Sequence, residues 1–293
     1  MKTVVFYYTQ SGQALSVAQR IAGPLSSEDG CGVVVMKEIV PVERYPFPWP
    51  RDIFFDTFPE TRLGMPPSGI ERMDLRDVAD ADVVLVVGQS WFLSPSLPLQ
   101  SFFMDAAVRV YLQGRPVVFV NACRNMWLMT REKVRGYVEE AGGQFVGHIL
   151  LQDEGPNLVS LVTIIRWLVY GKKEGTWLLP AAGITEKDIQ EASRFGAIIR
   201  DAAAKGDFTC LQSQLDAAGA VHEKPVVMFM EQTGHRMFGF WAKFVRRAGG
   251  FRDPHRRWRV KLFDWYLMTV LFVVSPWSPV IYSLNKGLRK LKK

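Results

Sequence analysis

The chain has 293 residues, 48% of them hydrophobic, which is enough apolar sequence to fill a core and excludes a disordered protein. Its three cysteines are scattered and form no C-x-x-C pair, so neither a disulfide framework nor a zinc site is indicated, and a reducing, cytoplasmic setting is expected. The net charge of +7 is unevenly distributed along the chain. Residues 236–293 contain 14 Lys or Arg and two acidic residues, Asp253 and Asp264, whereas the rest of the chain is mildly acidic.

Five short runs rich in Val, Ile and Phe predict buried parallel strands, at residues 3–8, 33–39, 82–88, 116–121 and 145–151. The first run opens the chain as a strand, so no signal peptide is expected there. Helical periodicity falls between the strands, at residues 14–22, 97–112 and 130–141. Strands that alternate with helices predict a doubly wound α/β sheet.

Residues 41–74 interrupt this alternation with a segment dense in proline and aromatic residues, including Tyr45-Pro-Phe-Pro-Trp-Pro50. A connection this long is usually functional or disordered, and its aromatic content argues against disorder. Two interpretations stand: an ordered flap that covers a pocket, or a rigid aromatic belt packed on the edge of the sheet.

After Gly155 the chain changes character, with helices expected at residues 158–170 and 185–204. The predicted organisation is therefore a first domain of residues 1–155, a helical extension of residues 156–235, and a basic and apolar tail of residues 236–293.

The loop after the first strand is suited to binding a phosphate. It places backbone N–H groups and the hydroxyls of Thr9 and Ser11 at the start of a helix, and Gly12 lets the backbone approach a ligand closely. The loop has no Walker lysine and no G-x-G-x-x-G, which disfavours nucleoside triphosphate and dinucleotide sites. Taken alone, it is also compatible with an ordinary capped turn. Loops after the third and fourth predicted strands converge on the same crevice, the expected ligand site of an open α/β sheet.

These loops resemble those of a known family. Thr9-Gln-Ser-Gly-Gln13 resembles the phosphate loop of flavodoxins. Residues 88–105, with Trp-Phe-x-Ser-Pro-Ser-Leu-Pro and Ser-Phe-Phe-Met-Asp, resemble the flavin-binding second loop and following helix of flavodoxin-like quinone reductases. The resemblance implies a five-stranded flavodoxin-like sheet in the order 2-1-3-4-5 that holds flavin mononucleotide (FMN). Ala14 stands where flavodoxins commonly carry a further hydroxyl.

A narrower resemblance, to DarA-type proteins of dialkylresorcinol biosynthesis, is carried by the aromatic flap and by three motifs. These are Tyr7-Tyr-Thr-Gln-Ser-Gly-Gln13, Phe58-Pro-Glu60 and Cys123-Arg-Asn-Met-Trp127. The resemblance implies an FMN-dependent oxidation that aromatises a lipophilic dialkylcyclohexanedione to a dialkylresorcinol.

By position, the family resemblance implies two groups of cofactor-binding residues. The phosphate is expected at Thr9, Gln10, Ser11, Gly12 and Gln13. The isoalloxazine ring is expected between Ser90, Trp91, Phe92 and Leu93 on one side and Asn121, Cys123, Arg124 and Asn125 on the other.

Arg124 is the candidate catalytic residue, because a guanidinium near the N1–C2 edge of the flavin would stabilise its anionic reduced form. The alternative is a surface arginine paired with an acidic neighbour. Cys123 is expected to pack rather than to act as a nucleophile, and the four histidines have no metal-binding spacing.

Residues 265–285 carry no charge and have basic residues on both sides. The run just reaches the ~20 residues that span a bilayer, but Pro276 and Pro279 interrupt it, which favours an in-plane or re-entrant anchor on the cytoplasmic face of a membrane. The alternative is a helix pair that covers the sheet or contacts a partner in a homodimer. Because this run is apolar, nucleic-acid binding by Arg256-Arg-Trp-Arg259 is the poorer interpretation.

Together these features predict an FMN-dependent oxidoreductase that acts on a lipophilic cyclic ketone or quinone. Two alternatives belong to other classes: a flavodoxin-type electron carrier with no organic substrate of its own, and a membrane-attached scaffold without flavin.

Overall fold

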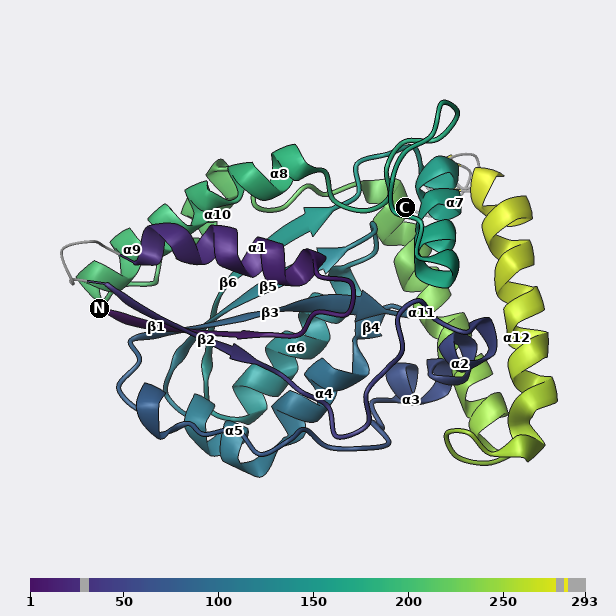
Figure 1. Cartoon of the computed structure of the whole chain (residues 1–293), viewed down its shortest axis with the longest axis horizontal. Helices are drawn as coiled ribbons and strands as arrows, with labels where there is room; N and C mark the ends of the chain where they lie inside the picture. Colours follow the sequence, from purple (N-terminus) through teal and green to yellow (C-terminus); the bar gives the residue numbers. More distant parts are fainter. Residues whose placement is uncertain (27–31, 278–281, 284–293) are drawn as a thin grey trace, which may run out of the picture.

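The computed structural model describes residues 1–26, 32–277 and 282–283 around a central parallel sheet (Figure 1). Its strands lie side by side in the order β2-β1-β3-β5-β6, and each neighbouring pair is parallel. Their bounds are β1 Lys2–Tyr7, β2 Val33–Glu38, β3 Val83–Trp91, β5 Pro116–Cys123 and β6 Gln144–Gln152. The two-residue strand β4, Ser94–Pro95, pairs antiparallel with the end of β3. Counted without β4, the order is 2-1-3-4-5, so the predicted fold class is confirmed.

Helices cover both faces of the sheet (Figure 1). One face carries α1 (Gln13–Ala22), α8 (Glu186–Glu191), α9 (Ser193–Lys205) and α10 (Leu211–Ala217), and the other α4 (Leu97–Met104), α5 (Ala106–Leu112) and α6 (Leu128–Glu140). Successive side chains of a strand point to opposite faces, so Val5 joins the first hydrophobic cluster while Val4 and Phe6 join the second. Ile199 and Leu215, from the predicted extension, lie in the same cluster as Val5.

Two predicted helices are each divided in the structure. The helix expected at residues 97–112 breaks at Asp105, because the carboxylate of this residue accepts hydrogen bonds from the N–H groups of Ala107 and Val108 and starts α5. The helix expected at residues 185–204 is divided into α8 and α9 at Ala192.

The proline-rich segment contains two short helices, α2 (Arg51–Asp56) and α3 (Phe58–Leu63). Trp49 is buried in the cluster beneath the sheet, with its ring 5.4 Å from that of Trp91. Trp49 also lines a cavity together with Phe54, and Phe54 and Phe55 line a second one. The segment therefore combines the two interpretations: it is packed on the core and it borders both cavities.

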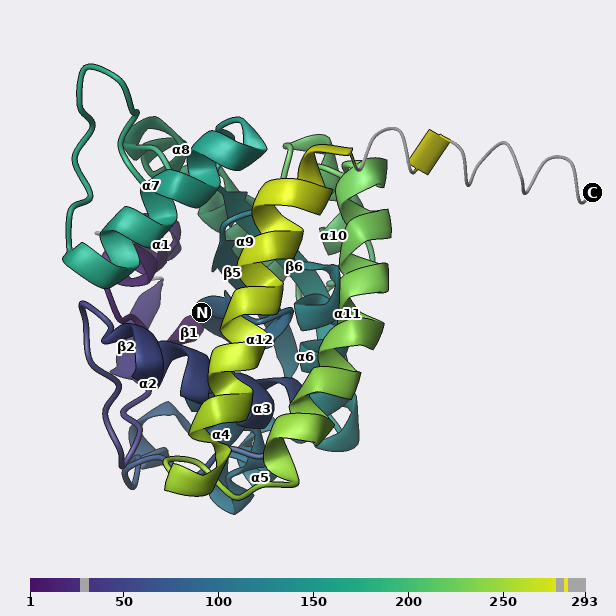
Figure 2. The same ribbon diagram turned by 90° about the vertical axis from the view of Figure 1, so that its right-hand side faces the viewer.

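Three longer helices lie at the carboxyl edge of the sheet: α7 (Asn157–Tyr170), α11 (Pro225–Arg246) and α12 (Arg257–Thr269) (Figures 1 and 2). A π-helical turn, Val270–Val274, and a 3-10 turn, Ser275–Trp277, continue α12. Helices α11 and α12 pack on α2 and α3, where the rings of Phe58 and Phe263 stack with centroids 3.6 Å apart. The described part of the tail is thus a helix pair that packs on α2 and α3.

Within the described ranges, every helix is too short or too polar to cross a bilayer. The predicted apolar run of residues 265–285 is described only at residues 265–277 and 282–283. Several residues of the sequence argument lie outside the described residues: Cys31, Pro279, Lys286, Arg289, Lys290, Lys292 and Lys293.

Candidate functional site

The loop between β1 and α1 forms an anion site from its backbone. Gly12 begins α1 with φ +86°, a left-handed conformation that glycine adopts without strain. No side chain of the described residues caps α1, so its first N–H groups are available to a ligand. The hydroxyl of Thr9 is buried and has no hydrogen-bond partner in the described part of the chain. An uncapped helix start beside an unpaired hydroxyl fits a phosphate.

Two glutamines of this loop use their side chains to hold neighbouring segments. Gln10 Nε2 donates to the Pro46 carbonyl oxygen at 2.9 Å. Gln13 donates to the Ile184 carbonyl oxygen at 2.9 Å and accepts from the Ile184 N–H at 3.2 Å. Gly183 lies close to the side chain of Gln13: a Cβ atom added to Gly183 would be only 2.7 Å from Gln13 Oε1. The side chains of Gln10 and Gln13 therefore order the flap and residues 183–184 around the loop, which leaves the loop backbone to meet a phosphate.

The end of β3 and the start of β4 form the second loop of the predicted site. Ser90 Oγ donates to Asn121 Oδ1 at 3.1 Å, and Asn121 Nδ2 is buried without a partner among the described residues. Trp91 packs against Trp49. Phe92 and Leu93 have positive φ angles of 46° and 60°, a conformation that non-glycine residues rarely adopt and that directs both side chains into the cavity described below.

The third loop is held by Asn157 at the first turn of α7. Asn157 Oδ1 accepts from Arg124 Nη1 at 2.9 Å and from Asn125 Nδ2 at 2.8 Å. Burial lowers the pKa of Arg124, while nearby Asp153 acts in the opposite direction. Arg124 is thus partly buried at the crevice and is held by Asn157, with the acidic Asp153 nearby. Burial also raises the pKa of the Cys123 thiol, which keeps it protonated at neutral pH.

Two adjoining cavities lie at these loops. The first, here the loop cavity, measures about 220 Å³ and runs from Ser11 and Gln13 to Trp167 on α7. The second, here the apolar cavity, measures about 210 Å³ and lies between α7 and α12. The two share part of their walls: Phe54, Ser90, Phe92, Cys123, Arg124, Ile164 and Leu168. Nine of the thirteen predicted cofactor residues line one or both of these cavities. A tenth, Asn121, is hydrogen-bonded to Ser90, which lines both.

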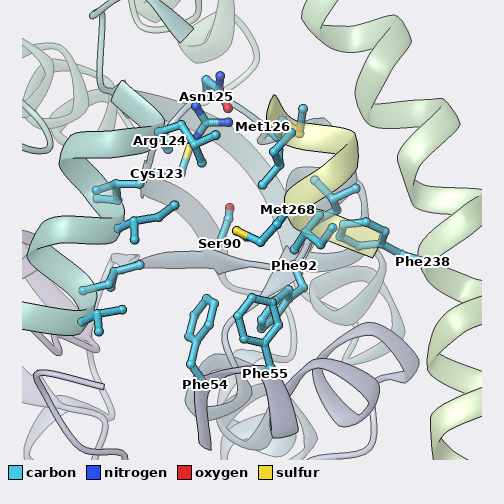
Figure 3. Close-up of a pocket in the computed structure, with 18 of the residues that line it drawn as sticks. Phe54, Phe55, Ser90, Phe92, Cys123, Arg124, Asn125, Met126, Phe238 and Met268 are labelled. Carbon is cyan, nitrogen blue, oxygen red and sulfur yellow. The ribbon is translucent and has the colours of Figure 1, made fainter. Parts of the chain in front are cut away.

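Polar groups gather at one end of the apolar cavity. Figure 3 shows Cys123, Arg124 and Asn125 at that end, Ser90 near the middle, and Phe54 and Phe55 at the opposite end. The other walls are mostly apolar, and Arg51 of α2 adds a second guanidinium to them. The apolar side chains come from α7, α11, α12, the turn after α12 and the loops that follow β3 and β5: Leu161, Ile164, Ile165, Leu168, Val169, Phe238, Leu267, Met268, Leu271, Phe92, Leu93 and Met126. Sequence reasoning missed the walls from α7, α11 and α12, because the periodicity of residues 158–170 indicated an apolar helix face but not the surface that it covers.

The fold is flavodoxin-like. Solved structures that share it include a flavodoxin from the domain Archaea, 17% identical with a TM-score of 0.40, and the flavodoxin, WrbA-like protein from Agrobacterium tumefaciens, 12% identical with a TM-score of 0.43. Each match covers 70% of this chain and 99% of the other. A flavoprotein from Lactobacillus acidophilus in complex with FMN is 17% identical with a TM-score of 0.38, over 51% of this chain and 92% of its own. No protein-family profile and no curated protein matches the sequence. These likenesses concern the fold alone, which the strand order already establishes.

Proposed function

We propose that this protein binds FMN and oxidises a lipophilic cyclic ketone or quinone. The observation that carries the proposal is the shared wall between the loop cavity and the apolar cavity at Ser90, Cys123 and Arg124. A flavin whose phosphate lies at the β1–α1 loop would have its ring at this boundary, next to the apolar space. A covered apolar space beside the ring is expected of an enzyme with its own substrate more than of an electron carrier with an open flavin edge.

The residues of the site fit the cofactor and have separate roles. Thr9 and the backbone of residues 10–13 would hold the phosphate, and the loops that carry Ser90 and Asn121 would border the ring. When bound, FMN would supply a hydride acceptor. Arg124, held by Asn157, presents a fixed positive charge that favours negative charge developing at the cavity boundary. The aromatic and aliphatic walls make the rest of this boundary apolar.

The finer proposal is that the substrate is a dialkylcyclohexanedione and the product a dialkylresorcinol. Aromatisation would remove two hydrogens from the ring, as a hydride and a proton; bound FMN would supply the hydride acceptor, and an external electron acceptor would be needed for turnover. The polar end of the apolar cavity suits the ring oxygens, and its remaining walls suit alkyl chains. This proposal rests on the DarA-type resemblance for the identity of the ring.

Cofactor binding is tested first, by visible absorption of the purified protein titrated with FMN. Thr9→Val removes the unpaired hydroxyl, and we expect it to weaken binding about tenfold. Thr3→Val is the matched control, because its hydroxyl is also buried and unpaired in the described structure but lies in the middle of the sheet. Failure of the unaltered protein to bind FMN would remove the oxidoreductase and leave the flavin-free scaffold.

Turnover is tested with the flavin-loaded protein under anaerobic conditions. A dialkylcyclohexanedione should bleach the flavin absorption with the appearance of an equal amount of resorcinol. Arg124→Met should slow this bleaching while FMN still binds. Binding of FMN without bleaching by the dione or by related cyclic ketones would instead favour the electron carrier.

A further inference from the structure

The outer side of α12 carries an apolar stripe exposed to solvent. Trp258, Leu262 and Trp265 are 46% to 76% exposed, and their spacing of four and three residues places them on one side of the helix. Phe272, 44% exposed, lies in the π-helical turn that continues α12 and extends the exposed apolar surface. The opposite side, with Phe263 at its centre, is buried against the rest of the protein. A surface helix normally turns polar residues outward, so packing among the described residues does not account for the stripe.

Exposed cations accompany the stripe on α12 and on the neighbouring helix α11. Arg257 and Lys261 are exposed on α12, and Lys243 and Arg247 lie on the outward side of α11 together with exposed Phe240. Figure 2 shows α11 and α12 side by side on the face turned to the viewer. We call the stripe and these four cations the α12 face.

The charge of this part of the chain complements an anionic surface. Residues 236–277 contain nine Lys or Arg against two Asp. Arg246, Arg252 and Arg256 are paired with acidic side chains of this chain, so the complementarity rests on the four exposed cations of the α12 face. Asp264 already pairs with Arg51 at 2.7 Å, so its charge is compensated within the protein. Each Lys or Arg near an anionic leaflet contributes about 1 kcal/mol of attraction. Aromatic side chains between cations suit the boundary of headgroups and acyl chains.

The apolar cavity takes part of its lining from α7 and α12. Figure 2 shows both of these helices on the face turned to the viewer. Met268 of α12 and Leu271 of the following π-helical turn form one of its walls, and Leu161 and Ile165 of α7 form another. A bilayer against α12 would therefore lie close to the space proposed for a lipophilic substrate.

We propose that the α12 face docks on an anionic phospholipid membrane, with the helix axis in the membrane plane, and that the apolar cavity takes its substrate directly from the lipid. Docking itself requires no cofactor. The second part rests on the proposed function.

The test is sedimentation of the full chain with phosphatidylcholine vesicles, with and without phosphatidylglycerol, at low and high salt. The unaltered protein should bind the anionic vesicles and keep part of this binding at high salt, because apolar insertion is not screened. Trp258→Ser/Trp265→Ser should lower the partition coefficient about tenfold or more and abolish the salt-resistant part. Val110→Ser on α5, an exposed apolar residue on another face, should change nothing.

A second pair of variants isolates the charge of the face. Arg257→Glu/Lys261→Glu should weaken binding to anionic vesicles about tenfold or more, whereas Lys187→Glu/Lys205→Glu on α8 and α9 makes the same change in net charge with a much smaller effect. Circular dichroism of each variant confirms that it is folded.

Two outcomes overturn the proposal. Equal vesicle binding by the tryptophan double variant and the unaltered protein would assign binding to other residues. A dimer in solution that Trp258→Ser/Trp265→Ser converts to monomer would make the face a contact between two copies of this chain. Each vesicle experiment is run with and without FMN, so that the docking result can be interpreted even if the protein does not bind FMN.

Discussion

Arg256 is the residue whose replacement tests most directly how the C-terminal helices are held. It is fully buried at the start of α12, where its Nε donates to Asp56 Oδ1 at 2.7 Å. Its Nη1 and Nη2 donate to the two carboxylate oxygens of Glu60 at 2.7 and 2.9 Å, and Nη2 also donates to the Asp56 carbonyl oxygen. One side chain thus joins α12 to both α2 and α3. We expect Arg256→Met to detach this end of α12.

The expected loss of stability follows from what the change leaves behind. Glu60 is 2% exposed, so its carboxylate would stay buried, with Arg246 Nε at 3.4 Å as a remaining charged neighbour. Removing one partner of a buried ion pair costs about 3–5 kcal/mol in the free energy of unfolding. Arg256→Met/Glu60→Leu removes both charges and should recover at least half of this loss.

Urea unfolding followed by circular dichroism measures these differences, and hydrogen exchange locates them in α12. Arg51→Met is the matched control, because Arg51 also joins α2 to α12, through Asp264 at 2.7 and 2.8 Å, but its side chain is half exposed. We expect this control to lose no more than about 1 kcal/mol. The reasoning is refuted if Arg256→Met costs no more than Arg51→Met, or if the double variant is as unstable as Arg256→Met alone.

Three further changes probe buried ionisable groups. Glu231 of α11 accepts hydrogen bonds from the N–H groups of residues 127–129 at the start of α6, so Glu231→Ala should cost about 2–4 kcal/mol and speed hydrogen exchange in residues 121–129. His148 stacks between Phe119 and Trp127, and both its ring nitrogens are unpaired within the described structure, so His148→Phe should stabilise the fold by about 1–3 kcal/mol. Burial lowers the pKa of His148 from 6.5 to about 3. Between these two pH values the unfolded chain binds a proton that the folded chain does not, so the free energy of unfolding falls as the pH falls. Acid should therefore destabilise the unaltered protein more than His148→Phe. Burial and nearby Arg62 lower the pKa of Lys133 from 10.5 to about 8. Between pH 8 and 10 the unfolded chain therefore keeps a proton that the folded chain has lost, so the free energy of unfolding should rise with pH in the unaltered protein but not in Lys133→Met.

Each of these expectations has its own contrary result. Unchanged exchange rates in residues 121–129 of Glu231→Ala would show that Glu231 does not order the third loop. Parallel acid-stability curves for His148→Phe and the unaltered protein would mean that His148 does not titrate on unfolding. For Lys133→Met, a rise in stability above pH 8 equal to that of the unaltered protein would assign the rise to another group.

The sequence by itself determined the central sheet and the loop at which a phosphate fits. The runs of Val, Ile and Phe that form β3 and β5 are apolar at nearly every position, a pattern that in strands of this length fits a parallel sheet covered on both faces. Gly12, in the loop between a strand and a helix and directly before the helix, indicated a close-approach turn, and its φ of +86° agrees. These are local features, so neighbouring residues suffice to predict them.

Only the tertiary structure decided what the apolar and basic end of the chain contacts. Phe263 belongs to a sequence that suits a membrane anchor as well as a helix pair, and its stacking on Phe58 joins residues about 200 positions apart. Arg256 belongs to a basic run that suggests a solvent-exposed position, yet the side chain is buried and forms ion pairs with Asp56 and Glu60. Gln13 is likewise hydrogen-bonded to Ile184, which lies 171 positions later in the sequence. Periodicity and charge show which side of a segment is apolar or basic, but which surfaces meet depends on how the whole chain packs.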